Sequence, residues 1–163
     1  MFCRMPSRRR RYSGSRAPSR KPLTKGMLLP MPECAAREIS LVNHLSFAAC
    51  RSGAGSAYLF NELIRLVYLS FYVQDAGFGD TDLMIYASVE AAVERSLERA
   101  ESGRAWMLDA EDLPLFEAVL RESDRQLAHA PRHVHIGARE RLERFATSGR
   151  ASPLRATKLG RRL

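Results

Sequence analysis

The chain has 163 residues, 45% of them hydrophobic, which is enough for one substantial core and typical of a single domain. Its net charge of +8 is divided unevenly, because residues 1–26 carry nine Arg or Lys and no acid, and residues 147–163 carry five and no acid. All eighteen carboxylates therefore lie in residues 27–146 beside twelve basic residues, which gives that part a net charge of −6 (12 − 18). This balance excludes a uniformly basic nucleic-acid-binding fold, so any nucleic-acid contact is expected from the basic ends.

Cysteine usage indicates a reducing compartment. The three cysteines, Cys3, Cys34 and Cys50, are odd in number and lack Cys-x-x-Cys spacing. This pattern predicts neither a disulfide framework nor a zinc knuckle. We therefore expect a cytoplasmic protein without a metal or another cofactor.

The N-terminal segment, residues 1–26, has too few large apolar side chains for a packed core and is predicted to be a disordered basic tail. Its arginine run and adjacent aromatic ring suit phosphate contact and base stacking. The residues predicted to contact nucleic acid are Arg8, Arg9, Arg10, Arg11 and Tyr12. Three other interpretations stay open: a solvated tail without a partner, attachment to an anionic membrane surface, and an upstream extension before a true start at Met27.

The first helix is predicted from Glu33, after a turn marked by Pro30 and Pro32. His44 falls within its pattern and is expected to be a satisfied, partly buried histidine. The helix ends at the loop RSGAGS, whose Ser56 can cap the next helix. The loop lacks a third glycine and a Gly-Lys-Ser/Thr sequence, so it is interpreted as a connector between helices instead of a phosphate-binding loop.

The central element is predicted over residues 57–74, AYLFNELIRLVYLSFYVQ, where twelve of eighteen residues are large and apolar. Its polar residues Asn61, Glu62 and Arg65 cluster on one narrow strip, which is typical of a buried central helix. A membrane span is the alternative, but charges in mid-span make it costly. The apolar circumference exceeds what four neighbouring helices are expected to cover, which favours a homo-oligomer.

Three further elements follow in chain order. Gly77 is predicted as a left-handed cap, and Asp80 or Thr81 as the start of a third helix. The connection Trp106-Met107-Leu108 is expected to dock on the core, and a fourth helix opens at Asp109 to Asp112 with Pro114 in its first turn.

The fifth helix is predicted after Pro131, which separates His129 from the other two histidines of HAPRHVH. His129, His133 and His135 are interpreted as ordinary surface histidines and not as a metal site, because no Cys, Asp or Glu lies at ligand spacing. The remaining face of this helix is predicted to be a mixed-charge solvent face. Gly149 and Pro153 then end regular structure before a second basic tail.

Several stretches carry a resemblance to known proteins. They are HLSFAACRSGAGS leading into NELIRLVYLSFYVQDAGFGD, from His44 to Asp80, and the later Trp106-Met107-Leu108 and Pro114-Leu115-Phe116. With these stretches, residues 39–135 resemble a group of small proteobacterial proteins, some of which are labelled Fis-family transcriptional regulators. The resemblance implies a regulator that binds DNA. Fis-type regulators end in a helix-turn-helix with a basic recognition helix, whereas here a mixed-charge helix and a Pro-containing tail stand at that end, so no DNA-contacting residue is carried over.

The sequence thus predicts an all-α protein with one compact domain of about five helices around the central hydrophobic helix. The acidic helical domain is expected over residues 27–147, between disordered basic tails at 1–26 and 148–163. The predicted function is that of a non-enzymatic cytoplasmic binding or regulatory protein, with nucleic acid and a second copy of the chain as expected partners. The alternative is a small helical enzyme or ligand-binding bundle with a site near His44, Arg51, Glu62 and Arg65.

Overall fold

The computed structural model describes residues 22–154, and this part of the chain is a bundle of six helices without a strand. The all-α prediction is therefore confirmed. The helices are α1 (Lys25–Leu28), α2 (Glu33–Ser52), α3 (Ala57–Asp75), α4 (Leu83–Glu101), α5 (Leu113–His129) and α6 (Arg132–Ala146). Five of them are the predicted ones, and the single turn of α1 was not expected.

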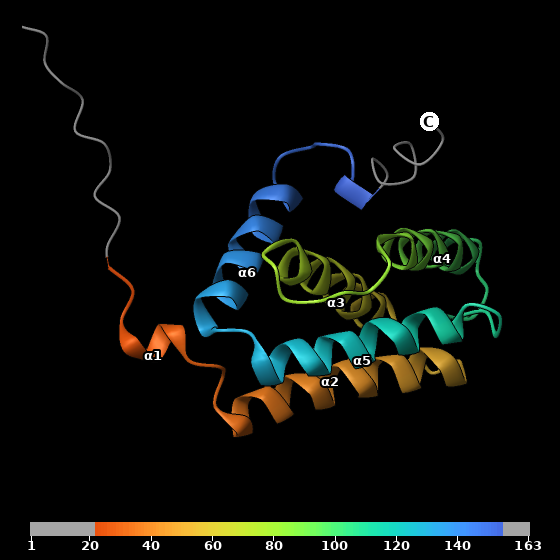
Figure 1. Cartoon of the computed structure of the whole chain (residues 1–163). Helices are drawn as coiled ribbons and strands as arrows, with labels where there is room; N and C mark the ends of the chain where they lie inside the picture. Colours follow the sequence, from red (N-terminus) through yellow and green to blue (C-terminus); the bar gives the residue numbers. More distant parts are fainter. Residues whose placement is uncertain (1–21, 155–163) are drawn as a thin grey trace, which may run out of the picture.

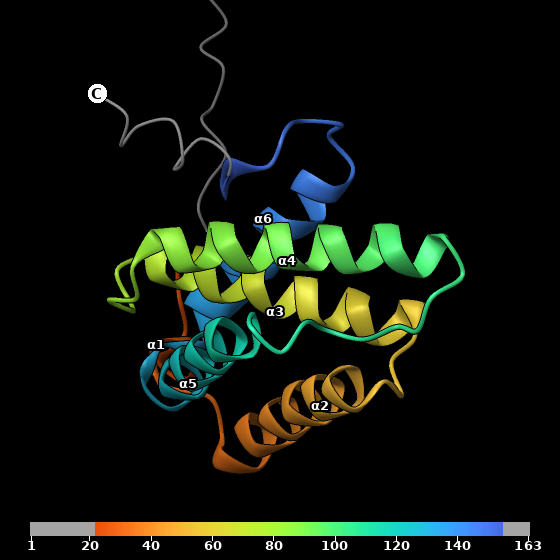
Figure 2. The same ribbon diagram turned by 90° about the vertical axis from the view of Figure 1, so that its right-hand side faces the viewer.

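Helix α3 is the centre of the bundle, as predicted. It packs against α2, α4, α5 and α6, which enclose it in both ribbon views (Figures 1 and 2). Tyr58 is the one large apolar residue of α3 that is mostly exposed, at 67%. Leu59, Ile64 and Leu69 are partly buried and the other large apolar residues of α3 are buried, so the neighbouring helices cover most of its apolar surface. Among the described residues no helix is both long and apolar enough to cross a membrane.

Most helix ends lie where the sequence predicted them. The Ser56 hydroxyl accepts a hydrogen bond from the Leu59 N–H at 3.3 Å, and Gly53 and Gly77 adopt left-handed conformations with φ of 81° and 95°. The predicted cap of the third helix was wrong. Asp82 caps α4 by accepting from the Met84 N–H at 2.9 Å, while Asp80 pairs with Arg125.

The connection between α4 and α5 docks on the core, as predicted for Trp106 and Leu108. The Leu108 N–H donates to the Cys50 carbonyl at 3.0 Å, and the Trp106 ring packs edge-on against Phe60 with centroids 5.6 Å apart. Met107, in contrast, is 45% exposed.

The described chain after α6 is exposed over residues 147–151 and contacts the core at its end. Leu154 is completely buried in the core, and the Tyr68 hydroxyl donates to Ser152 Oγ at 3.0 Å. The sequence analysis did not predict the burial of Leu154, which lies in the segment expected to be a tail. The predictions for Arg8 to Arg11 and for Tyr12 concern residues outside the described range.

Candidate ligand cavity

The four residues of the predicted ligand site fall into separate places. Glu62 and Arg65 form an ion pair on α3 with N and O atoms 3.6 Å apart. His44 lies elsewhere on α2, where its Nε2 is 2.9 Å from Asp124 Oδ2. Arg51 is exposed in the last turn of α2. The structure therefore brings together Glu62 and Arg65 only, and His44 is a satisfied but half-exposed histidine that ties α2 to α5.

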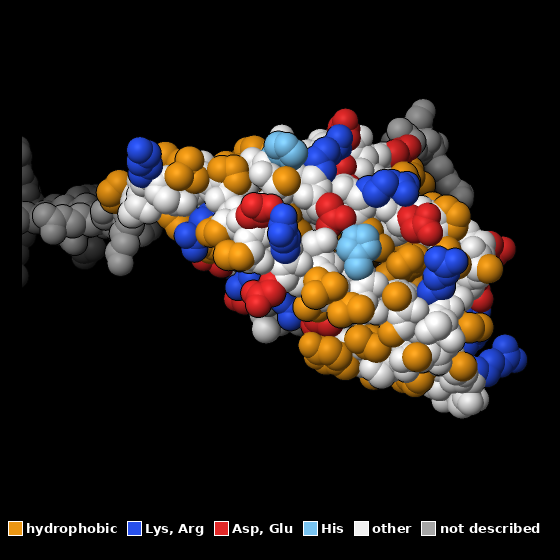
Figure 3. All heavy atoms as spheres, turned by 90° about the horizontal axis from the view of Figure 1, so that it is seen from below, with side chains coloured by type: hydrophobic (Ala, Val, Ile, Leu, Met, Phe, Trp, Pro, Cys, Tyr) orange, Lys and Arg blue, Asp and Glu red, His pale blue; other side chains and the backbone are white. Residues whose placement is uncertain are grey.

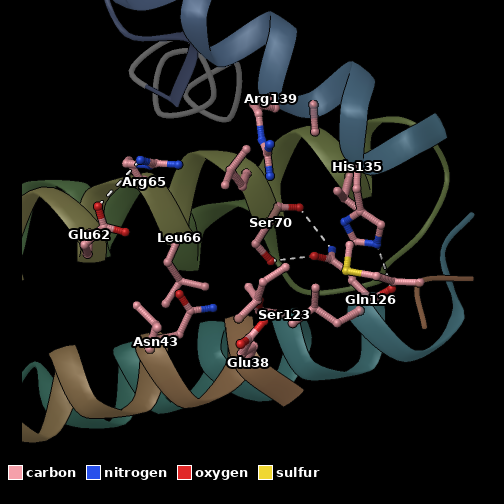
Figure 4. Close-up of a pocket in the computed structure, with 17 residues that line it drawn as sticks. Glu38, Asn43, Glu62, Arg65, Leu66, Ser70, Ser123, Gln126, His135 and Arg139 are labelled. Atoms are coloured by element: carbon pink, nitrogen blue, oxygen red, sulfur yellow. Dashed lines mark hydrogen bonds and ion pairs between the residues drawn. The ribbon is translucent and has the colours of Figure 1, made fainter. Parts of the chain in front are cut away.

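Glu62 and Arg65 lie at the edge of a cavity of about 430 Å³ between α2, α3, α5 and α6. Small-molecule sites typically have volumes of ~300–1,000 Å³ and mostly apolar walls with a few polar groups. The walls here have that character, and Figure 4 shows the labelled side chains around the hollow. The apolar lining consists of Met31, Ile39, Val42, Leu66, Leu69, Val73, Leu127 and Ala138.

The polar groups at the floor of the cavity are already bound to one another. Ser70 Oγ donates to Gln126 Oε1 at 2.8 Å, and Gln126 Nε2 donates to the carbonyls of Ser70 and Phe78, each at 3.0 Å. Tyr86 extends the network by donating to Gln74 Oε1 at 3.0 Å. Buried polar groups that are satisfied in this way hold the helices in register, and they leave little hydrogen-bonding capacity for a ligand.

His135 stands at one end of the cavity with its orientation fixed. Its Nε2 lies 3.2 Å from the Gln126 carbonyl oxygen, so this nitrogen carries the proton and donates. The other ring nitrogen, Nδ1, faces the hollow (Figure 4). Burial lowers the pKa of His135, and the nearby Arg139 lowers it further. The ring is therefore neutral at pH 7 and presents a hydrogen-bond acceptor to the cavity.

The rim of the cavity carries polar side chains for which the described part of the chain supplies no hydrogen-bond or ion-pair partner. The Arg139 guanidinium extends from α6 toward the hollow (Figure 4), and within residues 22–154 it forms neither an ion pair nor a hydrogen bond. Glu38 and Asn43 of α2 stand on the opposite side. An unpartnered guanidinium at the edge of an apolar hollow is suited to a carboxylate, which it can bind through two parallel N–H donors.

Sequence reasoning missed both Arg139 and His135. Arg139 was assigned to a mixed-charge solvent face and His135 to the surface histidines. The two residues are four apart on α6 and border its buried stripe of Val134 and Ala138, so they share one face beside the core. That border position was the available signal, but the facing helices could not be known from it.

The three C-terminal histidines do not converge. His129, His133 and His135 each bind a different backbone carbonyl, of Arg125, Met27 and Gln126. His133 and His135 are half-buried and so differ from the predicted surface histidines. Within residues 22–154 no three His, Cys, Asp or Glu side chains are grouped to hold a metal ion.

A second group of charges, around Arg125, has a structural role. Arg125 pairs with both Asp80 and Glu122, and it lowers the pKa of Asp80. Glu122 is buried, and its Oε2 also accepts from the Thr81 hydroxyl at 3.0 Å. These contacts join the loop before α4 to α5.

The chain was also compared with known proteins. No protein-family model matches it, and neither a curated protein nor a solved structure does.

Proposed function

We propose that this protein is a non-enzymatic binding protein whose helical domain holds a small amphipathic carboxylate in the cavity. The observation that carries the proposal is the Arg139 guanidinium, which has no ion-pair or hydrogen-bond partner among residues 22–154, at the rim of a cavity with apolar walls. A ligand with an apolar body and one carboxylate would place the body against Leu66, Leu69 and Val73 and the carboxylate on Arg139. Burial of the ligand's apolar body in the cavity supplies most of the affinity, and the charge-assisted hydrogen bonds to Arg139 set the ligand's orientation.

A binding role fits the cavity better than catalysis. An activated nucleophile requires a Ser, Cys or Thr hydrogen-bonded to a base. In the described part of the chain no histidine has such a partner, because His44 binds a carboxylate and the other three bind backbone carbonyls. The Cys50 thiol is buried, and burial raises its pKa to about 11, which keeps it protonated.

Calorimetric titration of the full chain with decanoate tests the proposal. Decanol is the matched uncharged probe, R139Q removes the guanidinium, and R144Q is the control variant because Arg144 lies on the same helix outside the cavity. We expect decanoate to bind more tightly than decanol, and R139Q to lose about tenfold or more in affinity, since one charge-assisted contact contributes about 1.5–3 kcal/mol. Equal affinities of R139Q and R144Q, or no binding of decanoate, would contradict the proposal.

Contact with nucleic acid through the basic ends is a second candidate function. It is supported by the separation of charge, with Arg8 to Arg11 in an acid-free segment beside an acidic middle, and it agrees with the resemblance to labelled transcriptional regulators. Such a protein would act in the cytoplasm as a ligand-responsive regulator, and self-association would give it two basic segments at one site.

Fluorescence anisotropy with random duplex DNA over a salt series tests this second function. The full chain should bind with an affinity that falls steeply as the salt concentration rises. Replacing Arg8 to Arg11 by Ser should reduce the slope of log K against the logarithm of the salt concentration by at most about four. If the variant binds with the same slope as the wild type, these arginines do not contact the phosphates.

A further inference from the structure

Helix α2 carries a row of exposed apolar side chains, here called the ridge, on the side that faces away from the other helices. Leu41 and Leu45 are 58% and 59% exposed, and Ala48 one turn further is exposed too. In Figures 1 and 2 the outer side of α2 is not covered by another helix. The space-filling view from below shows hydrophobic side chains gathered on this face (Figure 3). Such a continuous exposed patch is typical of an interaction surface.

The exposed residues of this ridge form a straight row along α2, and a second helix can pack along such a row. We define the α2 seam as six exposed residues, Cys34, Glu38, Leu41, Leu45, Ala48 and Ser52. They follow one another in steps of three or four residues and span 18 residues in five steps, so they lie on one straight line along the helix. The centre of the seam is apolar and its ends are polar.

The charges beside the seam indicate that the partner helix is a second copy of α2 in antiparallel orientation. Glu33 in the first turn and Arg51 in the last turn are 18 residues apart (51 − 33), about five turns at 3.6 residues per turn, so they flank the seam on the same side. A two-fold axis across the seam brings Glu33 of each copy to Arg51 of the other. Parallel pairing would instead put Glu33 of both copies at one end and Arg51 of both at the other, without an opposite charge from the partner helix beside them, and would align the two helix dipoles.

We propose that two copies of this protein associate through antiparallel packing of their α2 seams, with Leu41 of one copy against Leu45 of the other. This surface differs from α3, on which the sequence placed self-association. The contact is isologous, as in most homodimers. Glu33 also pairs with Arg37 in its own helix, but both side chains are more than three-quarters exposed, so that pair is easily exchanged for the intermolecular one.

Sedimentation velocity of the full chain over a concentration series tests the proposal. The wild type should form a dimer, and L41E/L45E should weaken it by about tenfold or more because central apolar contacts carry most of the binding energy. I136E is the matched control, because Ile136 is an exposed apolar residue on α6. A wild type that stays monomeric, or equal dimerisation of L41E/L45E and the wild type, would overturn the proposal.

Two further variants test the orientation of the pair. E33R should weaken the dimer, and the charge exchange E33R/R51E should restore it. In the antiparallel register Cys34 faces Ser52, since 34 + 52 equals 41 + 45, so S52C in a C3S background should give a disulfide-linked dimer on mild oxidation. Two results together would overturn the antiparallel arrangement. In the first, the charge exchange does not restore the dimer; in the second, Cys34 crosslinks to Cys34 of the other copy and not to position 52.

Discussion

At the scale of single residues, burial and one hydrogen bond determine the protonation and the orientation of His135, which lines the cavity. Its Nε2 proton is committed to the Gln126 carbonyl, and its pKa lies below the usual 6.5 because burial disfavours the charged ring. Between the lowered pKa and 6.5 the unfolded chain binds more protons than the folded one. Stability therefore decreases as the pH falls from neutrality through 6.5 toward the folded-state pKa.

H135Q should remove this part of the pH dependence, because its amide can still donate to the Gln126 carbonyl but does not titrate in this range. We expect the wild type to lose more unfolding free energy than H135Q when urea denaturation is compared at about pH 7.5, 6.5 and 5.5. Parallel pH profiles for the two proteins would show that His135 is not the group responsible.

At Gly55 the backbone packs directly against another segment of the chain and leaves no room for a side chain. A Cβ at this position would overlap the carbonyl oxygen of Trp106, which belongs to the connection docked on the core. G55A should therefore destabilise the protein by ~1–3 kcal/mol in urea denaturation, as overpacking of a tight site does.

G137A is the control for G55A. Gly137 lies within α6, and a Cβ there would meet nothing within 4 Å. Since alanine is the better helix former, G137A should raise stability by roughly 0.5–1 kcal/mol. Equal effects of the two substitutions would show that Trp106 does not approach Gly55 closely.

At the scale of elements, local signals made most helices predictable. Ser56, Gly53 and Gly77 fix helix ends through their own backbone or side-chain chemistry, and the apolar circumference of α3 identified the central helix. The start of α4 was not predictable in this way. Asp80, Thr81 and Asp82 are all suitable caps, and the contacts of Asp80 with distant Arg125 leave Asp82 as the cap.

The burial of Leu154 in the C-terminal segment was not predictable from the sequence for a related reason. Leu154 is one apolar residue among basic and polar neighbours, so its composition resembles a tail, yet its side chain is completely buried. L154A should cost ~2–4 kcal/mol of unfolding free energy through lost burial and a cavity, measured by urea denaturation. L23A serves as the control, because Leu23 is 51% exposed, and it should change stability by less than about 0.5 kcal/mol. Similar values for both variants would contradict the docking of this segment.

At the scale of the whole molecule, the cavity arises where four helices meet, and this explains why only part of it was predicted. Glu62 and Arg65 are three residues apart on one helix, so the sequence alone places them together. Arg139 and His135 reach the same hollow from α6, and their proximity to α3 depends on how the helices pack. The charge distribution, in contrast, is a property of the sequence, and the role of its basic ends stays a prediction.

Methyl NMR of the full-length protein during titration with decanoate tests the central claim, that the cavity is a ligand site. We expect chemical-shift changes at Leu66, Leu69 and Val73, which line the cavity, and none at Leu97 of α4, which does not. Shifts confined to Leu41 and Leu45 would show that the probe adheres to the exposed face of α2. That result, or the absence of any shift, would contradict a ligand site between α2, α3, α5 and α6.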